Sequence, residues 1–445
     1  MSADEHVNLI VVGGGAAGLA AAGAAERAGL SALLLEAQDR LGGRIATRPL
    51  ESGGVFDEGA QMANRDMRAV LELARRAGLT LSRFRDAGRA VCVFGDRTAS
   101  TEAFMSMDDV HERLRRGGSP LARLRRVGSA VRSALGGRPA RPESLADTLA
   151  DLSLSPEETA LAASILTELF GRAPEALDAW AVRDVDGRYA SERSDMEFQI
   201  VEGMGRIVEA LAGELQRPPV LGEPVLRVEE TADGVVVQTA KRRLSCDYAV
   251  LAVPPPAARR IDLVAARAEE LDGLLGSFVS GDMIKTVLVY RRAFWRAEGL
   301  SGHAAFADPA GLVVVDASLD GDGPPRLVAF QGGPAARAAA ALDAGTRRDR
   351  LLAHLARAFG EEAAAPAETA EAVWVDHPWC GGGYNASVRL GGASDAVARL
   401  AAWSGRLRFA GAEFDDRFWG HVEGAIGSGR AAVARIVAEA KHQAA

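Results

Sequence analysis

The chain has 445 residues, more than the roughly 250–300 at which a single hydrophobic core stops growing, so two domains are expected. Its net charge of −8 argues against nucleic acid as the main partner, and its composition is that of an ordinary globular protein. The three cysteines are odd in number and far apart, which favours a reducing compartment over a disulfide framework.

The N-terminus begins with an acidic segment and a short apolar run over residues 7–12. This run is too brief for a signal peptide, so we expect mature sequence from the start. No stretch reaches the roughly 18 uncharged apolar residues that a membrane helix needs. We therefore expect a cytoplasmic protein with no transmembrane segment. The sequence leaves the oligomeric state open, a homodimer included.

The first forty residues predict a strand, a glycine-rich turn, a helix and a second strand. The first strand covers residues 7–12, the alanine-rich helix 16–28 and the second strand 31–35. The candidate binding residues in this unit are Gly13, Gly15, Ala17, Gly18, Glu36 and Gln38. The three glycines have G-x-G-x-x-G spacing, and Glu36 ends the second strand.

Each part of this unit has a physical reason to bind a dinucleotide. Gly13 permits a tight turn, Gly15 lets the backbone approach a pyrophosphate, and Gly18 lets the helix and strand pack closely. The helix N-terminus offers free N–H groups and a positive dipole end to phosphates. Glu36 can accept hydrogen bonds from ribose hydroxyls. The alternative is a plain strand-to-helix turn, because glycine-rich turns are common.

Two stretches that follow resemble the FAD-containing amine oxidases and their relatives. "EAQDRLGGRIATR" (residues 36–48) is similar to that family's second fingerprint, in which Gly43 and Arg44 would approach the pyrophosphate and the flavin. "FDEGAQ" (residues 56–61) stands where the family's chain passes the isoalloxazine, which implies that Gly59, Ala60 and Gln61 bind the cofactor. The residues alone indicate only a dinucleotide. The choice of FAD over NAD rests on the resemblance.

The C-terminal stretch "RFAGAEFDDRFWGHVEGAIGSGRAAVARIVAEA" (residues 408–440) resembles the closing FAD motif of the same family. It reads as a strand end, a loop and an amphipathic helix over 425–440. The resemblance implies that Ala412, Glu413 and Val422 contact the cofactor, with the helix start facing the flavin's pyrimidine edge. A helix N-terminus suits a ring edge that gains negative charge.

The middle stretch from residue 198 to 215 resembles the family's G-G-M-G segment, with Glu202 in place of the first glycine. Val225 falls where family members contact the adenine end. The resemblance implies an α/β fold. A Rossmann-type FAD-binding domain would be assembled from residues 1–75, 198–276 and 377–445. An α+β substrate-binding domain of mixed sheet and helices would be assembled from residues 76–197 and 277–376.

Lys285 lies in a strand-like run, "GDMIKTVLVY", in a chain whose 52 basic residues include only three lysines. Strand alternation puts Lys285 on the same face as Met283, Val287 and Val289. The run resembles the family's substrate-domain strand, whose lysine reaches through a water toward flavin N5. A desolvated lysine has a lowered pKa and is a compact donor, unlike arginine. The alternative is an exposed strand face on which the ammonium reaches water.

"VWVDHPWCGGGYNAS" (residues 373–387) resembles a family segment that passes the flavin, with Trp379 as a cofactor contact. Many family members frame the amine with two aromatic rings. Tyr384 matches the first position, and His421 stands at the second. His421 could take a proton or bind a polar substrate group, or it could be a packed, hydrogen-bonded residue with no chemical role.

The flavin-linking cysteine of monoamine oxidases is replaced here by Gly383, so we expect non-covalent FAD. Cys380 is nearby but does not match that position. Together with His377 it makes a poor metal site, and no metal is expected.

An arginine-rich stretch over residues 113–141 allows two interpretations: a patch for a membrane surface or acidic partner, or a solvated helix over the substrate entrance. The second is favoured because the whole chain is acidic. Two short helices are expected within residues 142–172, one of them starting at Ser155-Pro156.

The function that the resemblance implies is oxidation of an amine to an imine by hydride transfer to flavin N5. Oxygen would reoxidise the flavin and give hydrogen peroxide, with Lys285, Tyr384 and His421 as the catalytic candidates. Two alternatives are an isoprenoid desaturase or dehydroxylase of similar fold, and a non-catalytic FAD-binding protein. The sequence does not name the amine, although Arg65 or Arg68 could clamp the carboxylate of an amino acid.

Overall fold

The computed structural model describes residues 6–85, 87–101, 141–152, 154–321 and 323–443. Apart from Arg141, the arginine-rich stretch lies outside these residues, so its two interpretations stay open. Within the described ranges, no helix combines the length and the apolar character that crossing a bilayer would require.

The first sheet has seven strands around a parallel core. Its order is β13-β10-β11-β12-β1-β2, and β21 also pairs with β12. The strands are β1 (His6–Val12), β2 (Ala32–Leu35), β10 (Val225–Glu230), β11 (Val235–Thr239), β12 (Arg243–Leu251), β13 (Asp262–Val264) and β21 (Leu407–Phe409). Strands β2, β1, β12 and β21 run parallel, so their carboxyl ends meet at one edge, where such sheets bind ligands.

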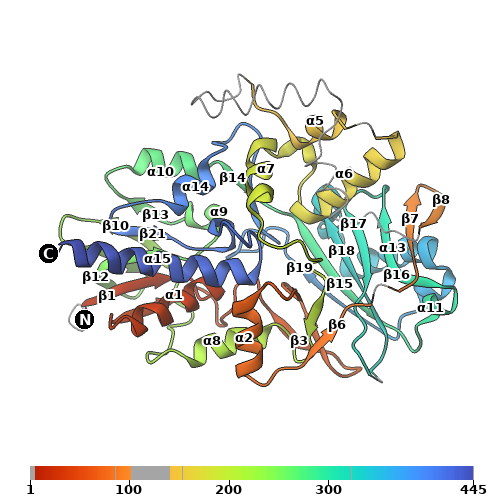
Figure 1. The fold of residues 1–445 in the computed structure, drawn as a ribbon, viewed down its shortest axis with the longest axis horizontal. Coiled ribbons are helices and arrows are strands. Elements are labelled where there is room, and N and C mark those ends of the chain that lie inside the picture. Colours follow the sequence, from red (N-terminus) through yellow and green to blue (C-terminus); the bar gives the residue numbers. More distant parts are fainter. Residues whose placement is uncertain (1–5, 86, 102–140, 153, 322, 444–445) are drawn as a thin grey trace.

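Helices cover both faces of this sheet. One face carries α1 (Ala16–Arg27), α2 (Arg68–Arg76), α8 (Gly205–Gly213) and α15 (Val422–Gln443), and the other carries α10 (Ala268–Leu275) and α14 (Ala396–Ala401). Helices α1 and α15 come from opposite ends of the chain and lie side by side (Figure 1). Gly429 permits this, because a Cβ there would lie 2.1 Å from the Ala17 carbonyl oxygen. Helix α15 begins at Val422, three residues before the predicted start.

The second sheet also has seven strands, in the order β19-β15-β18-β17-β16-β7-β8. Its strands are β7 (Arg89–Phe94), β8 (Arg97–Thr101), β15 (Met283–Val289), β16 (Leu300–Phe306), β17 (Leu312–Asp316), β18 (Arg326–Gly332) and β19 (Glu368–Val373). Only the β16–β7 pair is parallel. Helix α6 (Pro156–Phe170) packs on one face and α13 (Ala344–Phe359) on the other.

Helix α6 begins as predicted, since the Ser155 side chain accepts from the Glu158 N–H and Glu158 returns the bond in a capping box. It runs for 15 residues, so of the two helices predicted to be short only α5 (Leu145–Ala150) is short.

The remaining elements are β3 (Thr47–Pro49), β4 (Val55–Asp57), β5 (Met62–Ala63), β6 (Leu81–Arg83), α7 (Ala179–Arg188), β9 (Phe198–Ile200), α9 (Pro255–Ala258), β14 (Phe278–Ser280), α11 (Phe294–Ala297), α12 (Gly333–Ala340), β20 (Ala386–Val388) and the short 3-10 turns Pro174–Ala176, Glu361–Ala364 and Ala412–Phe414.

The predicted α/β class is confirmed. The strands of the first sheet all come from residues 1–75, 198–276 and 377–445, and those of the second from 76–197 and 277–376. This distribution agrees with the proposed division into two domains, whose boundaries stay a prediction. Lys285 lies on strand β15, which is second from the edge of the second sheet and pairs with β18 and β19.

Candidate active site

A cavity of about 1370 Å³ runs from the carboxyl edge of the first sheet to the face of the second. Residues that follow β1, β2 and β12 line one end, and Lys285, Val313 and Val315 of the second sheet line the other. Pockets for a single drug-sized ligand measure roughly 300–1000 Å³. The space therefore admits a dinucleotide together with a small substrate.

The three glycines of the first turn are required for different reasons. Gly13 has a φ of +107°, and a Cβ there would lie 2.6 Å from the Ala252 carbonyl oxygen. A Cβ on Gly18 would lie 1.9 Å from the Gly13 carbonyl oxygen, so this residue holds helix α1 against its strand. Gly15 has only Gly42 within reach, at 3.8 Å, and it borders the cavity. Its surroundings leave room for a ligand to touch the backbone.

The Glu36 carboxylate is anchored at the same edge. Its Oε2 accepts from the Gly14 N–H at 2.5 Å and its Oε1 from the Gln38 N–H at 2.8 Å. The side chain is 5 % exposed, and Gln38 and Val225 line the cavity beside it. The start of helix α1 has no side-chain cap, and its first residues, Ala16 and Ala17, line this end of the cavity. Free N–H groups beside a fixed carboxylate suit a pyrophosphate joined to a ribose.

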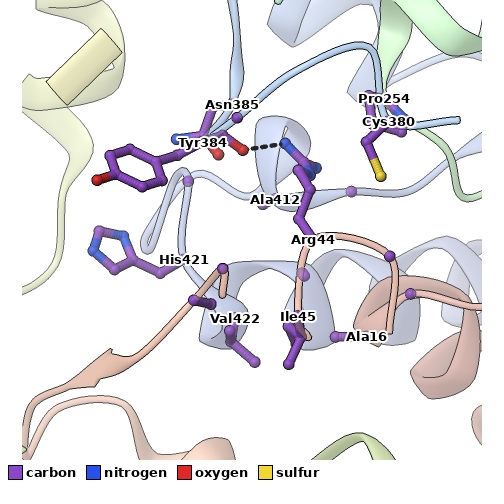
Figure 2. Close-up of a pocket in the computed structure, with 18 of the residues that line it drawn as sticks. Ala16, Arg44, Ile45, Pro254, Cys380, Tyr384, Asn385, Ala412, His421 and Val422 are labelled. Carbon is purple, nitrogen blue, oxygen red and sulfur yellow. Dashed lines mark hydrogen bonds between the residues drawn. The ribbon is translucent and has the colours of Figure 1, made fainter. Parts of the chain in front are cut away.

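The middle of the cavity is organised by a buried ion pair. The Arg44 guanidinium binds Glu413 at 2.5 Å and 3.0 Å, and it also donates to the Tyr384 carbonyl oxygen at 2.7 Å (Figure 2). Glu413 is fully buried and accepts from the Ala386 N–H at 3.0 Å. Burial would raise the pKa of Glu413, but Arg44 and these hydrogen bonds hold it below its usual range. Through these bonds the pair connects three segments that are distant in sequence, those of Arg44, of Tyr384 and Ala386, and of Glu413.

Lys285 is fully buried, and its Nζ donates to the Gly59 carbonyl oxygen at 2.9 Å. Its ammonium group lies 5.7 Å from the centre of the Phe56 ring and 5.3 Å from that of Phe330. Burial lowers the pKa of Lys285 to about 7, although the nearby Asp57 raises it. The exposed-face alternative is therefore wrong, because the side chain reaches the cavity wall opposite the glycine-rich edge.

Tyr384 and His421 project to the same side of Arg44 and line the cavity together (Figure 2). The Tyr384 hydroxyl donates to Glu168 Oε1 at 2.9 Å. Burial raises the pKa of Glu168 to about 7, while the bond from Tyr384 opposes this shift. Burial and the neighbouring Glu168 raise the pKa of Tyr384 well above its usual value, so the phenol stays protonated.

His421 is bound at both ring nitrogens. Its Nδ1 lies 2.8 Å from the Trp419 carbonyl oxygen, and its Nε2 lies 3.3 Å from Asp195 Oδ2 and 3.4 Å from the Tyr189 hydroxyl. Burial would lower the pKa of His421, but the Asp195 carboxylate and the Trp419 carbonyl bring it above its usual value. The ring therefore has a partner that stabilises its protonated form.

Most of the residues predicted from the sequence line this cavity. They are Gly13, Gly15, Ala17, Glu36, Gln38, Gly43, Arg44, Gly59, Ala60, Gln61, Val225, Lys285, Trp379, Tyr384, Ala412, His421 and Val422. The structure places Gly18 and Glu413 behind the wall, where one packs on backbone and the other holds Arg44. Trp379 is 42 % exposed and stands at the rim.

Neither arginine that the sequence offered as a possible carboxylate clamp is at the cavity. Arg65 is exposed and pairs with Glu197 at 2.8 Å, and Arg68 is exposed at the start of α2. Neither side chain borders the cavity. The physical reason for Arg65 is that Glu197 binds both its guanidinium and its backbone N–H, at 2.8 Å and 3.0 Å, and so holds it at the surface.

Sequence reasoning missed Glu168, Tyr189 and Asp195. An acid within the apolar run "SILTELF" was a signal for Glu168, because a carboxyl group on a core-facing helix needs a partner. Tyr189 and Asp195 follow helix α7 in an irregular segment without periodicity, so no local pattern marked them. Both reach His421 only through the tertiary fold.

A family model described as flavin containing amine oxidoreductase matches residues 16–437. Among curated relatives, an L-amino acid dehydrogenase from Synechocystis sp. is 27% identical over 98% of this chain and 96% of its own length. A putrescine oxidase from Kocuria rosea is 27% identical over 97% of this chain and 95% of its own.

Solved structures of amine oxidases also match almost the whole chain. A wild-type putrescine oxidase bound to putrescine superposes with a TM-score of 0.82 at 26% identity, covering 98% of this chain and 99% of that one. A cyclohexylamine oxidase from Brevibacterium oxydans superposes with a TM-score of 0.84 at 24% identity, covering 99% of this chain and all of the other. At that identity the second likeness supports the fold alone.

Proposed function

The chain belongs to the flavin-containing amine oxidoreductase family, and from that premise we propose that it oxidises an amine to an imine with non-covalent FAD and oxygen. When bound, FAD would supply the redox chemistry, as a two-electron acceptor for the hydride equivalent on the carbon beside nitrogen and a two-electron donor to oxygen, which would become hydrogen peroxide. The imine then leaves or is hydrolysed by water. The protein's own residues bind, orient and shield the reactants.

FAD would be held along the glycine-rich edge. The turn at Gly13 and Gly15 and the start of α1 would hold the pyrophosphate, and Glu36 would hold a ribose. The buried Gln61 Oε1 has no protein partner in the described part of the chain, so a ligand N–H group can satisfy it. Gly383 offers no thiol for a covalent link, and we expect denaturation to release all of the yellow colour into the supernatant.

The glycine turn gives a matched pair of substitutions. We expect Gly18→Ala to destabilise the protein by about 3 kcal/mol or more, because the new Cβ would overlap the Gly13 carbonyl oxygen. Gly15→Ala should leave the FAD-free protein as stable as wild type but weaken FAD binding at least about tenfold, because only the cofactor comes close to this position. Thermal midpoints and FAD fluorescence titrations measure the two effects. Equal FAD affinity in Gly15→Ala would contradict the proposed pyrophosphate site.

Three cavity residues carry the proposed catalytic roles. Lys285 would orient a water molecule and favour electron transfer to oxygen. Tyr384 and His421 would flank the amine and exclude water from it. The observation that supports this proposal most strongly is the convergence of these three side chains with the glycine-rich edge on a single cavity.

The rival functions make different demands on the same cavity. An isoprenoid desaturase or dehydroxylase would not need a buried lysine and an aromatic–histidine pair together. The Synechocystis relative makes amino acids candidates, but Arg65 and Arg68 are exposed outside the cavity. Two arginines that do line the cavity are already paired with carboxylates, Arg183 with Glu143 at 3.3 Å and Arg193 with Asp66 at 3.7 Å. We therefore propose that the substrate is an amine without an adjacent carboxylate.

The free, buried thiols of Cys92, Cys246 and Cys380 favour a reducing cytoplasm as the protein's compartment.

An anaerobic screen of the purified yellow protein tests this function. Amines and amino acids are mixed with it one at a time, and loss of flavin absorbance reports reduction. We expect simple amines to bleach the flavin and air to restore the colour with release of hydrogen peroxide. Bleaching by amino acids alone would overturn the substrate assignment. A flavin that no amine reduces would favour the non-catalytic alternative.

A further inference from the structure

We propose that Nε2 of His421 accepts the proton that a substrate ammonium must lose before oxidation, and that Asp195 is the positioning residue that holds this proton site ready. The inference deepens the proposed function and rests on it. It assigns His421, the second of the two rings expected to flank the amine, a proton-accepting role that a phenylalanine or tyrosine ring could not perform. It also gives a role to Asp195 and Tyr189, which the cofactor does not require.

The hydrogen-bond partners of His421 fix its tautomer. A carbonyl oxygen can only accept, so the 2.8 Å contact with the Trp419 carbonyl requires that Nδ1 carry the hydrogen. In the neutral ring the lone pair then belongs to Nε2. Any proton that the ring takes up must bind at Nε2.

Asp195 is itself held in place to face this nitrogen. Its Oδ1 accepts from the Tyr189 hydroxyl at 2.6 Å and from Asn64 Nδ2 at 3.2 Å. Its Oδ2 lies 3.3 Å from Nε2 of His421. A negative charge at this distance stabilises a protonated imidazole. His421 thus carries a fixed proton on Nδ1, and the Asp195 carboxylate lies beside Nε2, where a second proton would bind.

The other charged and titratable groups near the ring do not compete for this role. The ring of Tyr189 lies 5.4 Å from that of His421 and is tilted by 45° to it, and the Tyr384 hydroxyl is bound to Glu168. Glu423, two residues from His421, accepts from the backbone N–H groups of Ala69 and Val70 and is turned toward α2. Asp195 is therefore the carboxylate that acts on His421 directly.

The proton transfer is balanced and accessible. The ammonium N–H bond breaks, its electron pair stays on the substrate nitrogen, and the proton forms a new bond to Nε2. The His421 side chain keeps 26% of its surface exposed in the cavity and Asp195 keeps 39%. A small amine in the cavity can thus reach Nε2, and the proton can afterwards leave to water along Asp195. The alternative is that His421 is a packed residue whose hydrogen bonds to Trp419, Tyr189 and Asp195 only stabilise the local backbone.

The first arm of the test does not depend on turnover. Nitrogen-15 NMR of the FAD-loaded protein, labelled at histidine, follows the titration of the His421 ring, which is identified by the signal missing in His421→Phe. We expect Asp195→Asn to lower the pKa of His421 by about 1, because a partner carboxylate is replaced by a neutral amide of the same shape. The matched control Glu192→Gln removes a charge from the same exposed segment and should not move it.

The second arm measures flavin reduction by an amine found in the screen, as a function of pH. We expect the acid limb of this profile to move to lower pH in Asp195→Asn, because His421 loses its proton more easily there, and to vanish in His421→Phe. A limb that stays in place in Asp195→Asn while the NMR pKa falls would overturn the inference without touching the proposed function. An NMR pKa that does not move overturns it directly. A protein that no amine reduces fails the proposed function, and the inference fails with it.

Discussion

Replacing Glu413 with glutamine should lower the stability of the protein by about 3 kcal/mol, because it leaves the half-buried Arg44 cation without its fully buried counter-charge. Glutamine has the same shape and can still accept from the Ala386 N–H. The loss is therefore one of charge, not of packing. For a domain of about 220 residues, each kcal/mol shifts the midpoint by about 2–4 °C, so we expect a fall of about 6–12 °C in the thermal midpoint of the FAD-loaded protein. Scanning fluorimetry of the protein and of released flavin measures it.

The pH dependence of this effect has a definite sign. Arg44 and its hydrogen bonds hold the folded pKa of Glu413 below its usual value of 4.5, so the pair's stabilisation is fully present at higher pH. It is lost as pH falls through the folded pKa and the carboxylate takes up a proton. The difference between wild type and Glu413→Gln should therefore be largest near neutrality and shrink below about pH 4.5.

The matched control is Glu72→Gln. Glu72 pairs with Arg75 on the exposed face of α2, at 2.7 Å, so the same substitution breaks an ion pair in water. Exposed pairs contribute little, and we expect almost no change in the midpoint. If Glu413→Gln were no worse than Glu72→Gln, the buried pair would not stabilise the joint between the Arg44, Tyr384 and Ala386 segments.

The sequence predicted those parts of the site whose geometry is local. Gly13 and Gly18 are constrained by neighbours a few residues away or by the adjacent strand, so their spacing alone revealed them. Lys285 was predicted because strand alternation places it on an apolar face, and β15 is a regular strand. A short-range rule of backbone geometry was sufficient for the two glycines, whereas the role expected of Lys285 rested also on the family resemblance and on the scarcity of lysine in this chain.

Residues whose roles depend on distant segments were predicted less well. Glu413 was expected to touch the cofactor, but the structure places it behind Arg44, a residue 369 positions away in sequence. Asp195 reaches His421 across a segment with no regular structure. From the sequence, Arg65 was a reasonable candidate to bind a substrate carboxylate. In the structure it is held at the surface by Glu197 and the ring of Phe198. Periodicity carries no information about which irregular segments meet.

Lys285→Met should slow the reaction of the reduced protein with oxygen by about 10²-fold, while anaerobic reduction by an amine changes by less than about tenfold. A buried ammonium group favours movement of negative charge toward oxygen, and Lys285 has no solvent to compete with it. Methionine keeps the length and the apolar stem but removes the charge. Stopped-flow mixing of the reduced protein with oxygenated buffer separates this step from reduction.

The wild-type oxygen reaction should also depend on pH. Burial lowers the pKa of Lys285 to about 7, so the charged form prevails below that pH and the neutral form above it. We expect the rate to fall as pH rises through about 7 in wild type and to be flat in Lys285→Met. The exposed Lys241, which donates to the Gly222 carbonyl oxygen, supplies the control, and Lys241→Met should keep the wild-type profile.

The stability of Lys285→Met gives an independent check, because a cation that the fold desolvates is a cost. The folded pKa of Lys285 lies below its usual value of 10.5, so wild type loses stability as pH falls from about 10 to 7, and the loss is complete below 7. Lys285→Met is free of this term and should gain stability relative to wild type over the same interval, measured by thermal midpoints. A relative gain in stability combined with an unchanged oxygen reaction would show that the buried ammonium is desolvated but plays no part in reoxidation, and that its bond to the Gly59 carbonyl serves only to hold the turn.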